Sequence, residues 1–79
     1  MTPSVVLYSA RDCHLCDAAR RVLERARDDV PFRLEEVDIA GDADLERRYR
    51  ERIPVVEIDG AEAFTYVVHP KALRDRLGA

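Results

Sequence analysis

The residues best suited to chemistry in this 79-residue chain are Cys13 and Cys16, which are separated by His14 and Leu15. Residues three positions apart on a helix share a face, so the two sulfur atoms can reach each other. Such a pair can exchange disulfides: the Cys13 thiolate attacks a disulfide, and Cys16 then resolves the mixed disulfide. A bridge over so short a loop constrains the unfolded chain little, so stabilising the fold is a poor explanation for the pair.

The predicted position of Cys13 favours its thiolate form. This residue falls between a strand and the first turn of a helix, where unpaired backbone N–H groups and the positive end of the helix dipole meet. The dipole alone contributes about 0.3–1 kcal/mol, whereas one pKa unit corresponds to about 1.4 kcal/mol. N–H···S hydrogen bonds and the second thiol must therefore add to the dipole if the Cys13 pKa is to fall from about 8.5 to roughly 3.5–7.5.

Three polar residues flank the cysteines. Arg11 can favour the thiolate and attract an anionic substrate. His14 can tune the thiolate as a nearby titrating group, although a solvated residue at the helix start explains it equally well. Asp12 is expected to cap the helix rather than to react. Cys16 lies beside the predicted apolar stripe of the helix, so we expect it to be less exposed than Cys13.

Metal binding is the sharper alternative use of the same thiols. Zinc normally takes four ligands, and only His14, His69, Asp12 and Asp17 could join the two cysteines. One pair is half a site, so we expect no metal in a lone chain, while a cluster shared between two chains stays open. A pair of structural core cysteines fits poorly at a polar strand-to-helix corner.

Two elements must position the cysteines. Residues 4–9 form a continuous β-branched run too short for a helix, which predicts a strand covered on both faces in the middle of a sheet. Apolar or small residues then recur at helical spacing, and Pro31 marks the end of this helix. The stripe comprises Leu15, Ala18, Ala19, Val22, Leu23 and Ala26.

The middle of the chain predicts a second strand and a second helix. The strand covers 32–39, and a slip in its apolar alternation leaves the register uncertain and favours an edge position. Asp42 can cap the helix, which has acids at its start and arginines at its end, matching the helix dipole. Leu45 and Tyr49 provide its inner stripe.

A hairpin follows. Strands over 54–58 and 61–66 flank Asp59-Gly60, a dipeptide that favours the positive φ angles of a tight turn. A two-residue turn would set Glu57 opposite Glu62, and the repulsion between like charges favours a longer loop.

The last element is a short helix, since Pro70 suits a first helical position and Leu73 and Leu77 are four residues apart. The predicted order is β-α-β-α-β-β-α, in a single domain over 1–79. The β-α-β start requires a parallel pair and the hairpin an antiparallel one, so we expect an α/β fold with a mixed sheet and helices on both faces.

Composition narrows the classes of function. A formal net charge of −3 gives no general field for a polyanion, so we expect no nucleic-acid partner. The first residues contain no basic segment and lead into only four apolar residues, so we expect neither a signal peptide nor a membrane span, and a cytoplasmic protein. A monomer is the expected state.

These segments resemble the glutaredoxin family within the thioredoxin fold, particularly its small bacterial glutaredoxin-like branch. The resemblance covers residues 5–9 before the cysteines, then 36–39, 53–56 and 59–60. It implies a four-stranded sheet of order 2-1-3-4, with Cys13 as nucleophile and Cys16 as resolving thiol.

The same resemblance implies substrate contacts. Pro54 would be the cis-proline beside the cysteines, and Ile53 would offer backbone groups to a peptide-like substrate, with Arg11 and His14 as further contacts. The partners implied are a disulfide-containing protein and a thiol electron donor, either glutathione or a thioredoxin-reductase-type enzyme. A thioredoxin-fold interaction module without turnover is a further alternative.

Two departures bear on glutathione as a co-substrate. Glutaredoxins usually carry a Gly-Gly pair after the fourth strand, whereas residues 66–70 here contain no glycine. The residues between the cysteines are His-Leu instead of Pro-Tyr. No other cofactor is expected.

Overall fold

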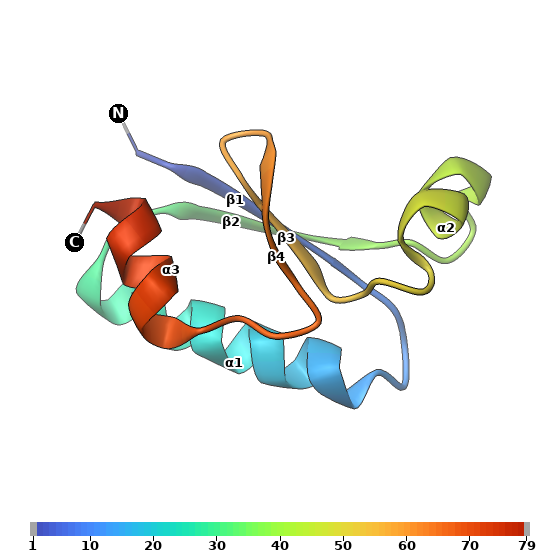
Figure 1. Cartoon of the computed structure of the whole chain (residues 1–79), viewed down its shortest axis with the longest axis horizontal. Coiled ribbons are helices and arrows are strands. Elements are labelled where there is room, and N and C mark those ends of the chain that lie inside the picture. Colours follow the sequence, from blue (N-terminus) through green and yellow to red (C-terminus); the bar gives the residue numbers. More distant parts are fainter. Residues whose placement is uncertain (1, 79) are drawn as a thin grey trace.

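The computed structural model describes residues 2–78 and contains the elements in the predicted order (Figure 1). The strands and helices are β1 (Ser4–Ser9), α1 (His14–Asp29), β2 (Arg33–Asp38), α2 (Ala43–Tyr49), β3 (Val55–Ile58), β4 (Ala61–Thr65) and α3 (Pro70–Leu77). The sheet order is β2-β1-β3-β4, with β1 and β2 parallel and the other pairs antiparallel. The predicted mixed sheet and its order 2-1-3-4 are confirmed.

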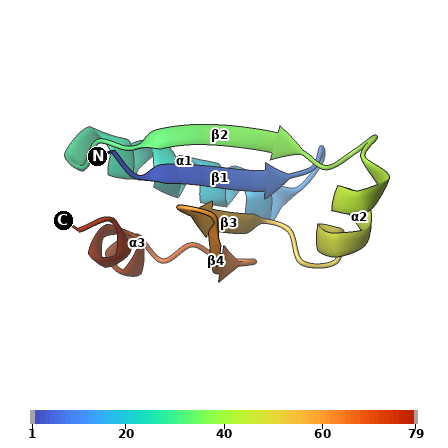
Figure 2. The ribbon, with the colours of Figure 1, turned by 90° about the horizontal axis from the view of Figure 1, so that it is seen from above.

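The helices cover the two faces of the sheet unequally. Helices α1 and α3 lie on one face, whereas α2 lies at the end of the sheet where β1 and β2 finish (Figures 1 and 2). Leu7, Leu23 and Leu73, from β1, α1 and α3, are fully buried in the main core. On the other face Tyr49 packs with Val55 in a smaller cluster. The prediction that β1 is covered on both faces therefore holds in part, because the second layer is short.

Helix α1 follows the predicted stripe except at Leu15 and Ala18, which are exposed. The buried positions are Cys16, Ala19, Leu23 and Ala26, spaced by three or four residues as one helix face requires. Leu15 is 49% exposed, so its assignment to the inner stripe is wrong. Cys16 occupies the inward position instead, and the residue before it is rotated out of that face.

The slip in β2 has a physical explanation. Leu34 packs against the main core, and Glu36, two residues on, points to the same face. Val37 lies on the opposite face. Leu34 and Val37 therefore pack on different sides of the sheet, which explains the interrupted alternation. Strand β2 is the outer strand paired only with β1, which confirms its predicted edge position.

The hairpin between β3 and β4 differs from the prediction. Asp59 and Gly60 have φ angles of 51° and 85°, and they form a two-residue turn in which Glu57 pairs with Glu62. The longer loop expected from like-charge repulsion is wrong. A register shift follows between Val56 and Glu57.

Glu57 and Glu62 can lie opposite each other because each carboxylate has its own hydrogen-bond donors. Glu57 accepts hydrogen bonds from the phenols of Tyr8 at 3.1 Å and Tyr49 at 3.2 Å, whose rings are stacked. Burial and the Glu57 carboxylate raise the pKa of the Tyr8 phenol. Glu62 pairs with Arg52, which lowers its pKa.

Both later helices begin as predicted. The Asp42 side chain accepts from the backbone N–H groups of Asp44 and Leu45, each at 3.1 Å, so it caps α2. Pro70 is the first residue of α3, which buries Leu73 and Leu77.

Candidate active site

Cys13 occupies the N-cap position of α1. Its backbone is extended, with φ −111° and ψ 104°, and its Sγ accepts a hydrogen bond from the Cys16 N–H at 3.1 Å. Asp12 was expected to cap this helix, and that prediction is wrong: Asp12 is exposed in the preceding turn with φ 56°. The sulfur therefore receives the backbone donor that a carboxylate or hydroxyl oxygen takes in most helices, which favours negative charge on it.

The two sulfurs form a disulfide, with the Cα atoms of Cys13 and Cys16 5.2 Å apart. Cys16 is fully buried, whereas Cys13 is partly exposed, as the sequence predicts. An incoming group therefore meets the sulfur of Cys13 first, and the sulfur of Cys16 stays behind it.

The flanking residues predicted as substrate contacts are exposed. Arg11 lies in the turn between β1 and α1, and His14 is the first residue of α1. Neither forms an ion pair within residues 2–78. Their proximity to Cys13 follows from the chain itself.

The Ile53-Pro54 segment lies at the same end of the sheet. Its peptide bond is cis, as the resemblance implies, and Pro54 is buried while Ile53 is partly exposed. Val55, the next residue, pairs with Tyr8 near the end of β1, from which the cysteine turn departs. The Pro54 carbonyl accepts from the Tyr66 N–H at 2.8 Å, which attaches the end of β4 to this segment.

A polar network beside the cysteine turn was not predicted. Glu36 accepts hydrogen bonds from Ser9 Oγ at 2.8 Å and Arg20 Nε at 2.7 Å, and Arg20 also pairs with Asp17 at 2.8 Å. Hydrogen bonding from Arg20 lowers the pKa of Glu36, and Glu36 in turn raises that of Arg20. The network joins β2, β1 and α1 next to Cys13. The slip in the apolar pattern of β2 was its only sequence signal.

Exposed apolar side chains are the second feature missed. Leu15, Tyr66 and Val67 are each about half exposed, at 49%, 48% and 50%. Tyr66 has φ 69° and donates its hydroxyl to the Glu51 carbonyl at 2.7 Å. It occupies the stretch where glutaredoxins usually carry the Gly-Gly pair, so an aromatic ring stands there instead.

Within residues 2–78, no three His, Cys, Asp or Glu side chains gather closely enough to hold a metal ion. The helices of this part of the chain are also too short or too polar to cross a membrane.

The sequence model for the glutaredoxin-like domain (DUF836) matches residues 4–78, which is nearly the whole chain. This chain belongs to that glutaredoxin-like family. No curated protein matches the sequence.

Solved structures agree with this family placement. The glutaredoxin-like chain is 36% identical to target protein XcR50 from X. campestris, with a TM-score of 0.77 over 92% of this chain and 93% of the other. Protein Ne2328 from Nitrosomonas europaea is 26% identical, with a TM-score of 0.85 over 99% and 94%. A thioredoxin mutant from Halobacterium salinarum, 20% identical with a TM-score of 0.70 over 95% and 71%, shows the thioredoxin-like fold.

Proposed function

We propose that this glutaredoxin-like protein is a dithiol oxidoreductase that reduces disulfides of other proteins. The Cys13 thiolate attacks one sulfur of the substrate disulfide, forms a mixed disulfide and releases the other sulfur as a thiolate. The Cys16 thiolate then attacks Cys13 Sγ, so the substrate leaves as a dithiol and the Cys13–Cys16 disulfide remains. A thiol donor supplies the two electrons that restore the reduced pair.

One observation carries this proposal: the backbone N–H of Cys16 points at the Sγ of Cys13, while Cys16 itself is buried behind it. The N–H and the helix dipole favour a thiolate at the outer position, where the nucleophile must be. The buried sulfur attacks only after the outer one has reacted. The same asymmetry supports Cys13 as the first nucleophile and Cys16 as the resolving thiol.

The backbone of Ile53 favours a peptide-like substrate. Within residues 2–78 its backbone N–H and C=O form no hydrogen bond to another backbone group, and its side chain is partly exposed. An extended substrate can use these free groups as an added strand does. Arg11 and His14 are proposed to contact the same substrate from the cysteine turn.

The donor is proposed to be a thioredoxin-reductase-type enzyme or glutathione. Tyr66 stands where the glycine pair is usual, and this departure argues against glutathione binding in the manner of glutaredoxins. We therefore favour a protein donor, in a monomer that acts in the reducing cytoplasm.

Variants of the two cysteines test the mechanism. The reduced protein is mixed with 2,2′-dithiodipyridine, and released 2-thiopyridone is followed by absorbance. We expect Cys13→Ser to abolish the fast release and Cys16→Ser to retain it while trapping thiopyridine on Cys13, seen by mass spectrometry. If neither substitution changes the rate, or if thiopyridine is trapped at Cys16 in the wild type, the assignment is wrong.

Metal analysis of protein purified without oxygen separates the cluster-binding alternative. We expect less than stoichiometric iron and zinc and no visible colour. One cluster per two chains, held by Cys13 and lost in Cys13→Ser, would contradict an oxidoreductase as the main function.

A further inference from the structure

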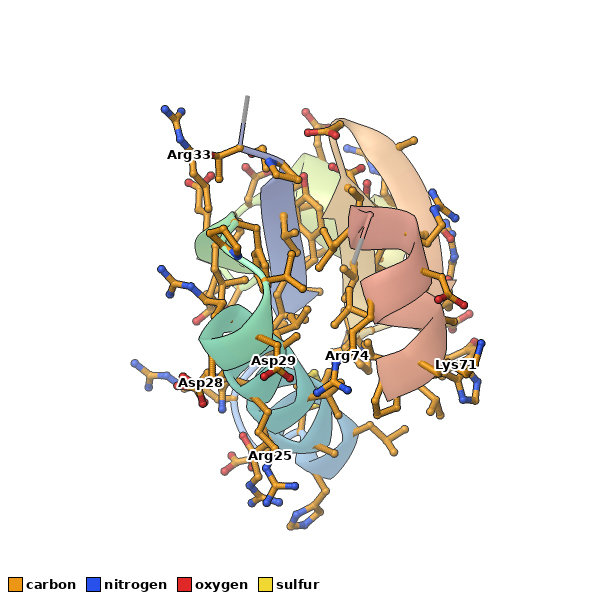
Figure 3. The ribbon with its side chains drawn as sticks, turned by 90° about the vertical axis from the view of Figure 1, so that its left-hand side faces the viewer. Arg25, Asp28, Asp29, Arg33, Lys71 and Arg74 are labelled. Atoms are coloured by element: carbon orange, nitrogen blue, oxygen red, sulfur yellow. A yellow bond between two sulfur atoms is a disulfide. The ribbon has the colours of Figure 1, made fainter. Side chains whose placement is uncertain are left out.

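A groove between α1 and α3 lies beside the proposed site and has no part in the steps above. Ala18, Val22 and Ala26 from α1 and Pro70 from α3 form its apolar floor. Arg74 of α3 points toward α1, where it pairs with Asp29 and closes one end (Figure 3). The groove is thus mainly apolar and bordered by guanidinium groups.

Two positively charged side chains on the groove have no ion-pair partner among the described residues. Arg21 and Arg25 line it one helical turn apart, and neither forms an ion pair within residues 2–78. Arg20 on the same helix is, by contrast, paired with Asp17 and Glu36. The surface complements carboxylates, although the chain as a whole is acidic.

A line of residues on α1 runs from the groove to the first turn of the helix, which Cys13 caps. Leu15, Ala18 and Val22 are spaced by three and four residues, so they share one side of α1. Leu15 lies in the first turn of α1, which Cys13 caps, and is half exposed. From Leu15 to Val22 the helix rises by about 10 Å, which an extended chain spans in about three residues. One short peptide segment can therefore lie in the groove with its cysteine at Cys13.

We propose that the groove between α1 and α3 docks an acidic segment of the disulfide-containing partner protein, close in sequence to the cysteine that reacts with Cys13. Its carboxylates pair with Arg21 and Arg25, and small apolar side chains between them contact Ala18 and Val22. This inference rests on the proposed disulfide exchange and adds the substrate class: proteins with acidic residues next to the reactive cysteine.

The test compares two synthetic peptides with reduced protein. Each carries one cysteine as a 2-thiopyridyl disulfide beside an Ala-Leu-Glu-Ala-Glu or an Ala-Leu-Gln-Ala-Gln segment, placed before or after the cysteine. Released 2-thiopyridone gives the rate constant, and neutral 2,2′-dithiodipyridine reports exchange without docking. With wild type at low salt we expect the acidic peptide to react about 5- to 10-fold faster than the neutral one in at least one of the two orders.

Charge reversal locates the effect. Arg21→Glu/Arg25→Glu is expected to remove or invert the preference for the acidic peptide and to leave the rate with 2,2′-dithiodipyridine unchanged. The matched control Arg33→Glu/Arg76→Glu makes the same change in net charge at exposed arginines outside the groove, and it should keep the preference. Equal loss in both double variants would indicate general charge attraction and overturn the proposal.

Filling the groove is an independent test without a change in charge. Ala18 is exposed, so Ala18→Trp places a ring over the floor, whereas Ala43→Trp adds the same ring at the exposed start of α2. We expect only Ala18→Trp to abolish the preference for the acidic peptide. No preference in wild type, with normal reduction of 2,2′-dithiodipyridine, refutes the docking groove alone; no reduction of the small disulfide refutes the proposed function.

Discussion

Glu36 shows at the residue scale how a carboxylate is tolerated on the helix-covered face of the sheet. Its contacts with Arg20 and Ser9 lower its pKa. The Glu36 carboxylate therefore takes up a proton more readily in the unfolded chain than in the folded one. The stability it contributes is therefore complete above about pH 4.5 and is lost as the pH falls through the lower, folded-state value. Because the Arg20 and Glu36 side chains are each about one third exposed, solvent screens the pair and its contribution to stability is small.

The corresponding prediction concerns Glu36→Gln. The variant should be less stable than wild type at neutral pH by less than about 1 kcal/mol, and the difference should shrink as the pH falls below about 4.5. Urea unfolding at neutral and acidic pH measures both. Glu35→Gln, on the other side of β2, is the control. Its difference in stability from wild type should not shrink as the pH falls. A difference that grows with acid would contradict the assigned ion pair.

Residue chemistry was partly predictable from the sequence. The spacing of Cys13 and Cys16 predicted the bridge, and the position of Cys16 beside the apolar stripe predicted their unequal exposure. Asp12 was misassigned as the cap because residue preference alone does not show that a thiol takes the same backbone donor. The contact of Arg20 with Glu36 was hidden because the two residues are sixteen positions apart in sequence.

At the element scale the β3–β4 turn determines the register of the hairpin. Gly60 has φ 85°, and a Cβ there would meet no atom within 4 Å. Gly60→Ala should therefore cost about 1–2 kcal/mol through backbone strain alone, and Gly60→Asn clearly less, because asparagine tolerates positive φ. Thermal unfolding of both variants checks the ranking. Equal losses would indicate a side-chain collision instead of strain.

The turn also shows why element boundaries were easier to predict than pairing. Asp59-Gly60 was correctly placed as the hairpin, and charge repulsion then favoured a longer loop. That reasoning omitted Tyr8 and Tyr49, which come from other elements and stabilise the Glu57 carboxylate by hydrogen bonding. Patterns within one segment do not reveal donors supplied by another.

At the scale of the whole molecule, stability depends on a small core. The main core joins α1, α3 and one face of the sheet, and Leu73 is fully buried there. Leu73→Ala should cost about 2–5 kcal/mol, a large share of the roughly 5–15 kcal/mol typical of a domain. Leu15→Ala, at a half-exposed position, should stay within about 0.5 kcal/mol. Urea midpoints of the two variants provide the comparison, and equal losses would contradict the burial described for Leu73.

The outer position of β2 has a consequence for how molecules of this protein meet one another. A strand bonded on one side only offers unpaired backbone groups to any extended chain, which is the usual starting point of aggregation. Here Arg33, Glu35 and Asp38 place exposed charges of both signs along that strand. A second molecule would have to desolvate these charges before adding its own strand, so this margin of the sheet resists growth into fibrils.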